Sequence, residues 1–135
     1  MQRPGRILAD TNAIIALLRG DEGVAELLDA APEVLLSAVV LGELTYGALN
    51  SRAVDANLAK LSDLARQCRF VPVDEPIVAE YGRVKTELKK QGRPIPENDI
   101  WIAASVLVND ASLLTADAHF EHIHRLNLIR VPAPG

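Results

Sequence analysis

Short apolar runs alternate along this chain with longer segments whose apolar residues recur at helical spacing. The short runs are rich in Leu, Ile and Val, which is typical of strands buried on both faces of a parallel sheet. The predicted strands are 7–10, 34–37, 70–73, 112–115 and 128–131. The predicted helices are 12–18, 22–30, 38–49, 55–67, 76–91, 99–109 and 118–125.

Several polar and proline residues mark the boundaries of these elements. Asp21 and Ser37 precede helical segments and are expected to act as N-caps, and Asn98 is expected to cap the helix over 99–109. Pro72 cannot donate a backbone hydrogen bond, so the strand over 70–73 is predicted to lie at an edge of the sheet. The proline-rich segment 92–96 is predicted to be a loop.

The regular alternation of strands and helices predicts an α/β fold with a parallel sheet covered on both faces. A length of 135 residues fits one domain. We expect a single domain over residues 1–135, with residues 1–5 and 132–135 as loose ends.

Composition and charge narrow the class of protein. The chain has one cysteine and no apolar run long enough for a membrane span or a signal peptide, so a cytoplasmic protein without a membrane partner is expected. The net charge of −4 argues against binding nucleic acid through bulk positive charge. It does not exclude a nuclease, because a bound metal ion can reverse the charge of an acidic site.

Four acidic residues stand where a ligand site would be expected. Asp10 and Asp117 follow predicted strands, and ligands of parallel sheets bind beyond the carboxyl ends of the strands. Asp99 stands in the first turn of a predicted helix, where a negative charge is favoured. Glu43 lies between Gly42 and Gly47 within one helix, and the cost of two helical glycines suggests that another group approaches closely there.

A divalent cation would turn the mutual repulsion of four converging carboxylates into binding, and Mg²⁺ or Mn²⁺ prefers such oxygen ligands. Spacing alone leaves other roles open for each acid. Asp10 and Asp117 are equally suited to be caps or turn residues, Asp99 can serve only as a partner of the helix dipole, and Glu43 can be a surface residue.

Two further groups have a simple structural explanation beside a functional one. His119, His122 and His124 are interpreted as surface histidines, because a zinc site would need more ligands than the chain offers nearby. The second group is basic and has two interpretations, a solvated helix end or a site that binds RNA phosphate; it consists of Lys89, Lys90 and Arg93.

An apolar group is weighed in the same way. Its members are expected to lie mostly in the core, although they could also form an apolar groove; they are Leu17, Leu18, Leu27, Leu28 and Tyr46.

Residues 8–12, 37–44, 98–104 and 114–120 together resemble the corresponding segments of PIN-domain ribonucleases, especially the VapC-type toxins of toxin–antitoxin pairs. The resemblance spans nearly the whole chain in the order and spacing of that family. It implies a three-layer α/β/α fold whose five parallel strands lie in the order 3-2-1-4-5. It also implies an RNA substrate, a cognate antitoxin and a homodimer.

The resemblance also assigns expected roles to residues. Asp10 and Asp99 would be the main ligands of Mg²⁺ or Mn²⁺, with Glu43 and Asp117 completing the acidic cluster. The side chains expected to hydrogen-bond around these ligands are Thr11, Asn12 and Thr115. The implied reaction is hydrolysis of an RNA phosphodiester by water activated at the metal, leaving a 3′-hydroxyl and a 5′-phosphate.

Two other functions remain open at this point. One is a PIN-fold nuclease that processes RNA without an antitoxin, and a single short domain favours the toxin over it. The other is a non-catalytic binding module with the same fold, against which the four intact acids argue.

Overall fold

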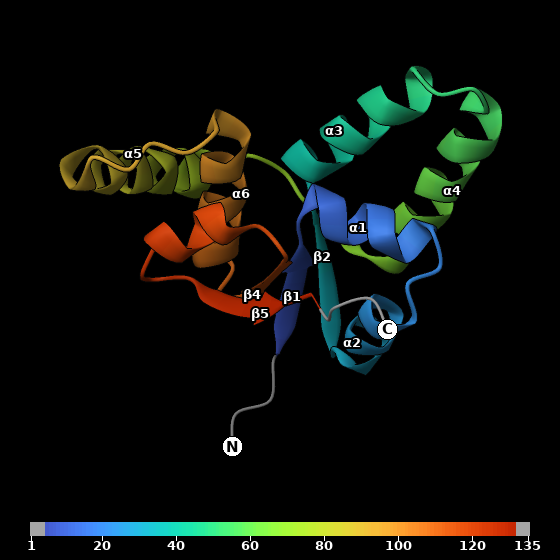
Figure 1. The fold of residues 1–135 in the computed structure, drawn as a ribbon, viewed down its shortest axis with the longest axis horizontal. Coiled ribbons are helices and arrows are strands. Elements are labelled where there is room, and N and C mark those ends of the chain that lie inside the picture. Colours follow the sequence, from blue (N-terminus) through green and yellow to red (C-terminus); the bar gives the residue numbers. More distant parts are fainter. Residues whose placement is uncertain (1–4, 132–135) are drawn as a thin grey trace.

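The computed structural model describes residues 5–131. Within them, five parallel strands form one sheet in the order β3-β2-β1-β4-β5 (Figure 1). The strands are β1 (Arg6–Ala9), β2 (Glu33–Ser37), β3 (Arg69–Val71), β4 (Ser112–Thr115) and β5 (Asn127–Arg130). Every neighbouring pair is parallel, and Leu8 of β1 is paired with both Leu35 of β2 and Leu113 of β4. The predicted fold class and strand order are confirmed.

Helices cover both faces of the sheet. They are α1 (Thr11–Leu18), α2 (Glu22–Ala30), α3 (Ala38–Leu49), α4 (Val54–Gln67), α5 (Glu75–Gln91) and α6 (Glu97–Val108). Figure 1 shows α1 to α4 on one side of the strands and α5 and α6 on the other. This division is expected for right-handed crossovers, because the chain moves across the sheet in one direction from β1 to β3 and returns in the opposite direction from β3 to β4, through α5 and α6.

The two central strands are buried between these layers. Ile7, Leu8, Leu113 and Leu114 have no exposed surface, which explains why β1 and β4 read as continuous apolar runs. The reversal of strand order lies between β1 and β4, and their carboxyl ends open toward a common edge.

The N-caps at Asp21 and Ser37 are confirmed. Asp21 accepts a hydrogen bond from the backbone N–H of Val24 at 3.0 Å, and Ser37 accepts one from Val40 at 3.0 Å. These bonds satisfy N–H groups that have no partner inside their helices, so each helix begins at a defined residue directly after its loop or strand.

The predicted cap at Asn98 is wrong. Helix α6 begins at Glu97, and Asn98 lies exposed within its first turn. The carbonyl oxygen of Pro96 accepts hydrogen bonds from the N–H groups of Asp99 (3.0 Å) and Ile100 (3.3 Å), so the helix starts earlier without a side-chain cap.

Most other boundaries lie within one residue of the prediction, but two elements differ more. Strand β3 lies at the sheet edge as expected but ends at Val71, because Pro72 has no N–H to continue the ladder. The predicted helix over 118–125 is instead a short 3₁₀ helix, η1 (Ala118–His122), which ends with the Ile123 N–H bonded to the Phe120 carbonyl. Of the predicted loose ends, 1–5 and 132–135, only Gly5 is described, and it lies exposed directly before β1; the others lie outside the described residues.

Candidate metal and active site

Asp10 and Asp117 lie at the carboxyl ends of β1 and β4 and are joined by one threonine. The backbone N–H of Asp10 donates to the carbonyl of Leu114 at 3.0 Å, which continues the β1–β4 pairing into Asp10. The hydroxyl of Thr115 donates to Oδ2 of Asp10 and accepts a hydrogen bond from the N–H of Asp117 at 2.9 Å. Thr115 is fully buried, so this connection is shielded from water.

The other carboxylate oxygen of Asp10 caps helix α1. Oδ1 accepts a hydrogen bond from the N–H of Ala13 at 2.8 Å. Burial raises the pKa of Asp10 above its ordinary value, while the bonds from Thr115 and Ala13 oppose this rise and the charges of Asp117 and Glu43 add to it. The carboxylate of Asp10 is therefore held in place by hydrogen bonds on both oxygens. Its raised pKa means that its negative charge is disfavoured when no cation is present.

Glu43 reaches the site from helix α3. Its Oε1 accepts a hydrogen bond from the hydroxyl of Thr11, at the start of α1, at 2.9 Å. Helices α1 and α3 pack together, so Thr11 holds the Glu43 carboxylate near the end of β1. The predicted role of Thr11 as a hydrogen-bonding partner within the acidic cluster has direct geometric support.

The close approach expected beside Glu43 is made by Thr11 and not at the two glycines. A Cβ at either glycine would meet no atom within 4 Å among the described residues, and both glycines are exposed. The two glycines instead leave the surface on either side of Glu43 open, which was not anticipated from their helical cost alone.

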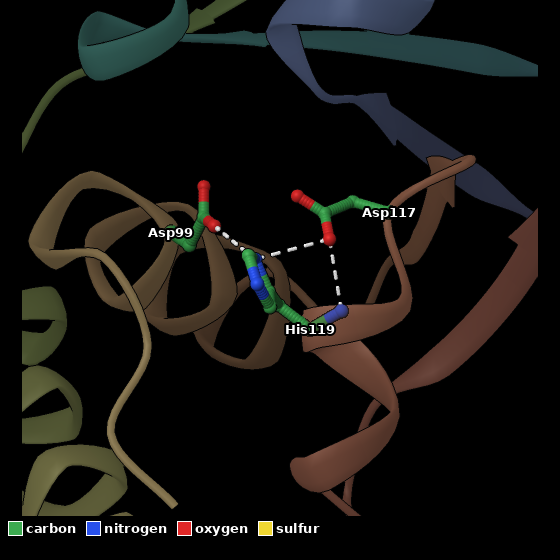
Figure 2. Close-up of side chains that lie close together, drawn as sticks. All are labelled: Asp99, Asp117 and His119. Atoms are coloured by element: carbon green, nitrogen blue, oxygen red, sulfur yellow. Dashed lines mark hydrogen bonds and ion pairs between the residues drawn. The ribbon is translucent and has the colours of Figure 1, made fainter.

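Asp99, Asp117 and His119 converge from two segments, the start of α6 and the turn that contains η1, as Figure 2 shows. Asp99 projects from the first turn of α6, Asp117 precedes η1, and His119 belongs to η1. The imidazole Nδ1 lies 3.1 Å from Oδ1 of Asp117 and 3.6 Å from Oδ2 of Asp99. The N–H of His119 also donates to Oδ1 of Asp117 at 2.8 Å.

His119 lies at the surface, as interpreted from the sequence, but its place beside two of the acids was not predicted. Its side chain is 52% exposed, but it is oriented toward two carboxylates of the candidate site. The available signal was its position two residues after Asp117, which becomes informative only when the short 3₁₀ turn is known.

The electrostatics of Asp99 tie the whole cluster together. Burial raises its pKa, the charge of Asp117 raises it further, His119 opposes the rise, and Glu43 and Asp10 add smaller upward contributions. Each of the other three acids thus acts on Asp99, which is expected only if all four carboxylates share one region.

Some predicted site residues lie outside this cluster. Asn12 is exposed in the first turn of α1 and lines a shallow surface hollow with Ile15 and Arg19. Within residues 5–131, no hydrogen bond joins Asn12 to any of the four acids.

The predicted RNA-binding residues Lys89, Lys90 and Arg93 are exposed at the end of α5. Gly92 ends this helix in the left-handed conformation (φ 66°), and the chain then doubles back along α5 to reach α6 (Figure 1). Because of this reversal, the three cations lie at the outer end of α5 and not beside Asp99.

The donor set fits a divalent cation of the Mg²⁺ or Mn²⁺ type. Four carboxylates supply hard oxygen ligands, and the raised pKa values of Asp10 and Asp99 show that each is disfavoured as an anion by burial and by its neighbours' negative charge. A cation between the carboxylates would remove this repulsion, and the nearby imidazole is also a possible ligand.

A groove borders the acidic cluster on the side of α1, α3 and α4. It has a volume of about 310 Å³ and is lined by apolar side chains that include Ile15, Leu18, Leu44 and Leu61, with Glu43 at its edge. Of the apolar group expected mostly in the core, Leu28 is buried, but Tyr46 is 72% exposed on α3. The core interpretation is therefore wrong for Tyr46.

No helix among residues 5–131 combines the length and apolar character needed to cross a bilayer.

Comparison with known proteins gives a consistent result. The family model described as "PIN domain" matches residues 7–126. Ribonuclease VapC1 of Haemophilus influenzae (strain R2866) is 34% identical over 113 residues, covering 80% of this chain and 84% of that protein.

Two solved structures have the same fold over nearly their full length. VapBC2 from Rickettsia felis, bound to a DNA fragment from its promoter, has a TM-score of 0.85 and 27% identity, covering 94% of this chain and 99% of the matched one. VapBC-1 from nontypeable Haemophilus influenzae has a TM-score of 0.84 and 31% identity, covering 93% and 97% respectively.

Proposed function

The chain belongs to the PIN domain family, and from this premise we propose that it is a divalent-metal-dependent endoribonuclease acting as the toxin of a toxin–antitoxin pair. The observation that carries the proposal is that Asp10, Glu43 and Asp117 all lie near enough to Asp99, beyond the ends of β1 and β4, for their charges to raise its pKa. The similarity to proteins named Ribonuclease VapC supports RNA as the substrate.

In this proposal Asp10 and Asp99 are the main ligands of Mg²⁺ or Mn²⁺, and Glu43 and Asp117 complete the acidic cluster. When bound, the cation supplies activation of a water molecule and stabilisation of negative charge on a phosphoryl oxygen. Thr115 holds Asp10 in place through its hydroxyl, while Thr11 does the same for Glu43.

These side chains leave no need for a nucleophile from the protein. Water attacks the RNA phosphorus and the 3′-oxygen departs, so the products carry a 3′-hydroxyl and a 5′-phosphate. Recovery of a 2′,3′-cyclic phosphate would overturn this mechanism, because that product requires attack by the RNA 2′-hydroxyl.

The test is cleavage of total cellular RNA by purified protein with Mg²⁺, with Mn²⁺ and with EDTA. We expect cleavage only with a cation, and none from Asp10→Asn or Asp99→Asn. Asparagine caps helices as well as aspartate does, so Asp10→Asn keeps the bond to Ala13 and should fold. Asp63→Asn removes an exposed acid of α4 and serves as the matched control.

Each outcome has a defined meaning. Cleavage that persists in EDTA, or in both site variants, would show that the acids are structural. Cleavage that fails with every RNA in the cation-loaded protein, freed of any copurifying partner, would favour a non-catalytic module.

We further propose that an antitoxin binds the apolar groove formed by α1, α3 and α4. Support comes from the similarity to chains solved as VapBC complexes and from the groove's position beside Glu43. An antitoxin segment lying there would reach the acidic cluster and block access of RNA. Exposed Tyr46 and Leu49 on α3 offer apolar surface to the same partner or to the second copy of a homodimer.

A further inference from the structure

The imidazole of His119 occupies a position that the proposed function has not used. We propose that His119 is a direct nitrogen ligand of the cation held by Asp99 and Asp117, and that this ligand makes the site favour Mn²⁺ over Mg²⁺. This inference rests on the proposed function, since it concerns the same cation.

The spacing of the three ligand atoms is close to that required around one ion. Ligands about 2.1 Å from an octahedral ion and at right angles to one another are about 3 Å apart. The Nδ1 of His119 lies 3.1 Å from Asp117 Oδ1 and 3.6 Å from Asp99 Oδ2. One ligand atom from each of the three residues lies within 4.8 Å of the others, so small side-chain rotations would bring all three onto one ion.

The backbone holds His119 in place for this role. Its N–H donates to Asp117 at 2.8 Å, and the next residue, Phe120, is completely buried and anchors η1 against the core. The imidazole itself is half exposed and faces the two carboxylates, as Figure 2 shows. Its orientation is therefore set by the turn that places Asp117 and not by burial of the ring.

A nitrogen ligand changes which cation the site prefers. Mg²⁺ binds oxygen ligands and sheds its water reluctantly, whereas transition-metal ions accept imidazole. Replacing one oxygen or water ligand with imidazole should therefore strengthen Mn²⁺ binding more than Mg²⁺ binding.

The competing explanation is a simple ion pair between a protonated His119 and the two carboxylates. In that case the imidazolium occupies the place of the cation and competes with it. Removal of His119 would then tighten Mn²⁺ binding, whereas removal of a ligand weakens it. The two explanations predict effects of opposite sign.

The experiment is pulsed electron paramagnetic resonance of the Mn²⁺-loaded protein, together with calorimetric titration of Mn²⁺ and Mg²⁺. We expect ¹⁴N modulation from a directly coordinated imidazole, which changes to the ¹⁵N pattern when histidine is ¹⁵N-labelled. In His119→Gln the nitrogen signal should disappear and the Kd for Mn²⁺ should rise about tenfold, with a smaller change for Mg²⁺. His124→Gln, which alters an exposed histidine, should leave both unchanged.

The outcomes separate this inference from the function on which it rests. One outcome is that the wild-type protein binds Mn²⁺ without nitrogen coupling, while Asp99→Asn abolishes the binding. That result would overturn the role of His119 and leave the metal site intact. Tighter Mn²⁺ binding in His119→Gln would establish the ion pair instead. Failure of the wild-type protein to bind Mn²⁺ at all would overturn both.

Discussion

At the scale of single residues, Thr115 links two members of the acidic cluster. It donates to Asp10 and accepts from the backbone of Asp117, although it touches no exposed surface. One hydroxyl thus fixes the relative position of two candidate ligands that are far apart in sequence.

We predict that Thr115→Val destabilises both the fold and the cation site. The isosteric methyl group leaves the Asp117 N–H without its acceptor and Asp10 without its donor, which should lower the free energy of unfolding by about 1–3 kcal/mol. Loss of a hydrogen bond to a metal ligand should weaken Mn²⁺ binding about 10- to 100-fold. Urea unfolding and calorimetric titration measure the two effects.

Thr115→Ser is the matched control, because it keeps the hydroxyl and removes only a methyl group. It should bind Mn²⁺ within a few-fold of wild type. Equal Mn²⁺ affinity in the Val and wild-type proteins would show that Thr115 has no part in positioning Asp10.

At the scale of elements, helix α5 is joined to the segment after η1 by an ion-pair network around Glu80. Arg125 binds both Glu80 and Glu87 of α5, and Arg83 also contacts Glu80 at 3.0 Å. Burial alone would raise the pKa of Glu80, but the hydrogen bonds and charges of Arg125 and Arg83 outweigh it and hold the pKa below its ordinary value.

We predict that this network stabilises the protein only above acidic pH. Because folding lowers the pKa of Glu80, its contribution is present above the unfolded value of 4.5 and is lost as pH falls through the folded value. Glu80→Gln should cost about 1–2 kcal/mol near neutral pH, less than for a fully buried pair because Arg125 is half exposed.

Urea unfolding of wild type and Glu80→Gln across the acidic range tests this. The difference between the two proteins should shrink toward zero as pH falls below 4.5. A difference that stays constant with pH would show that the carboxylate charge is not the source of the stabilisation. Glu26→Gln, an exposed acid of α2, is the control.

The basic end of α5 carries a prediction about RNA. Replacing Lys89, Lys90 and Arg93 together with alanine should weaken RNA binding and reduce its dependence on salt. The logarithmic slope should fall by about 0.7 for each RNA phosphate that these side chains no longer neutralise. Fluorescence anisotropy at several salt concentrations measures both quantities.

A second triple variant controls for net charge. Arg52, Arg66 and Arg69 are exposed in and beside α4, which lies at the opposite end of the molecule from α5 in Figure 1. Their replacement removes the same three charges and should leave the salt slope nearly unchanged. Equal effects of the two triples would mean that only overall charge matters.

Elements were easier to predict from sequence than their junctions. The apolar runs of β1 and β4 could be read directly because both strands are buried on both faces. The start of α6 could not, because the carbonyl of Pro96 satisfies the first N–H groups in place of the more obvious cap, Asn98. The 3₁₀ turn that orients His119 has no distinctive local pattern, so the histidine nearest the acids went unrecognised.

At the scale of the whole molecule, we predict that a bound cation stabilises the folded protein. Two of the four acids, Asp10 and Asp99, have raised pKa values, so the metal-free protein bears an electrostatic cost beyond the carboxyl ends of its central strands. The strand order that creates this cost was implied by family resemblance, because alternation of elements predicts a parallel sheet without fixing which strands are neighbours.

We predict that Mn²⁺ raises the melting temperature of the wild-type protein. A ligand that binds only the folded state at 100 times its Kd contributes about 2.7 kcal/mol. Asp99→Asn should lose most of this shift, yet melt no lower than wild type in EDTA because it relieves the repulsion. Scanning calorimetry with and without Mn²⁺ measures these melting temperatures. If Mn²⁺ raised the melting temperature of Asp99→Asn as much as that of wild type, Asp99 would not be a ligand of the cation.

The strand order also has a consequence for the protein's own synthesis. Asp10 and Glu43 leave the ribosome early, but β4 must be made before it can pair with β1 and bring Asp117 into place. A nascent or prematurely terminated chain therefore holds only part of its acidic cluster. On the proposed function, a chain that stops before β4 lacks Asp117 and Thr115, so we expect RNA cleavage to begin only when synthesis of the protein is almost complete.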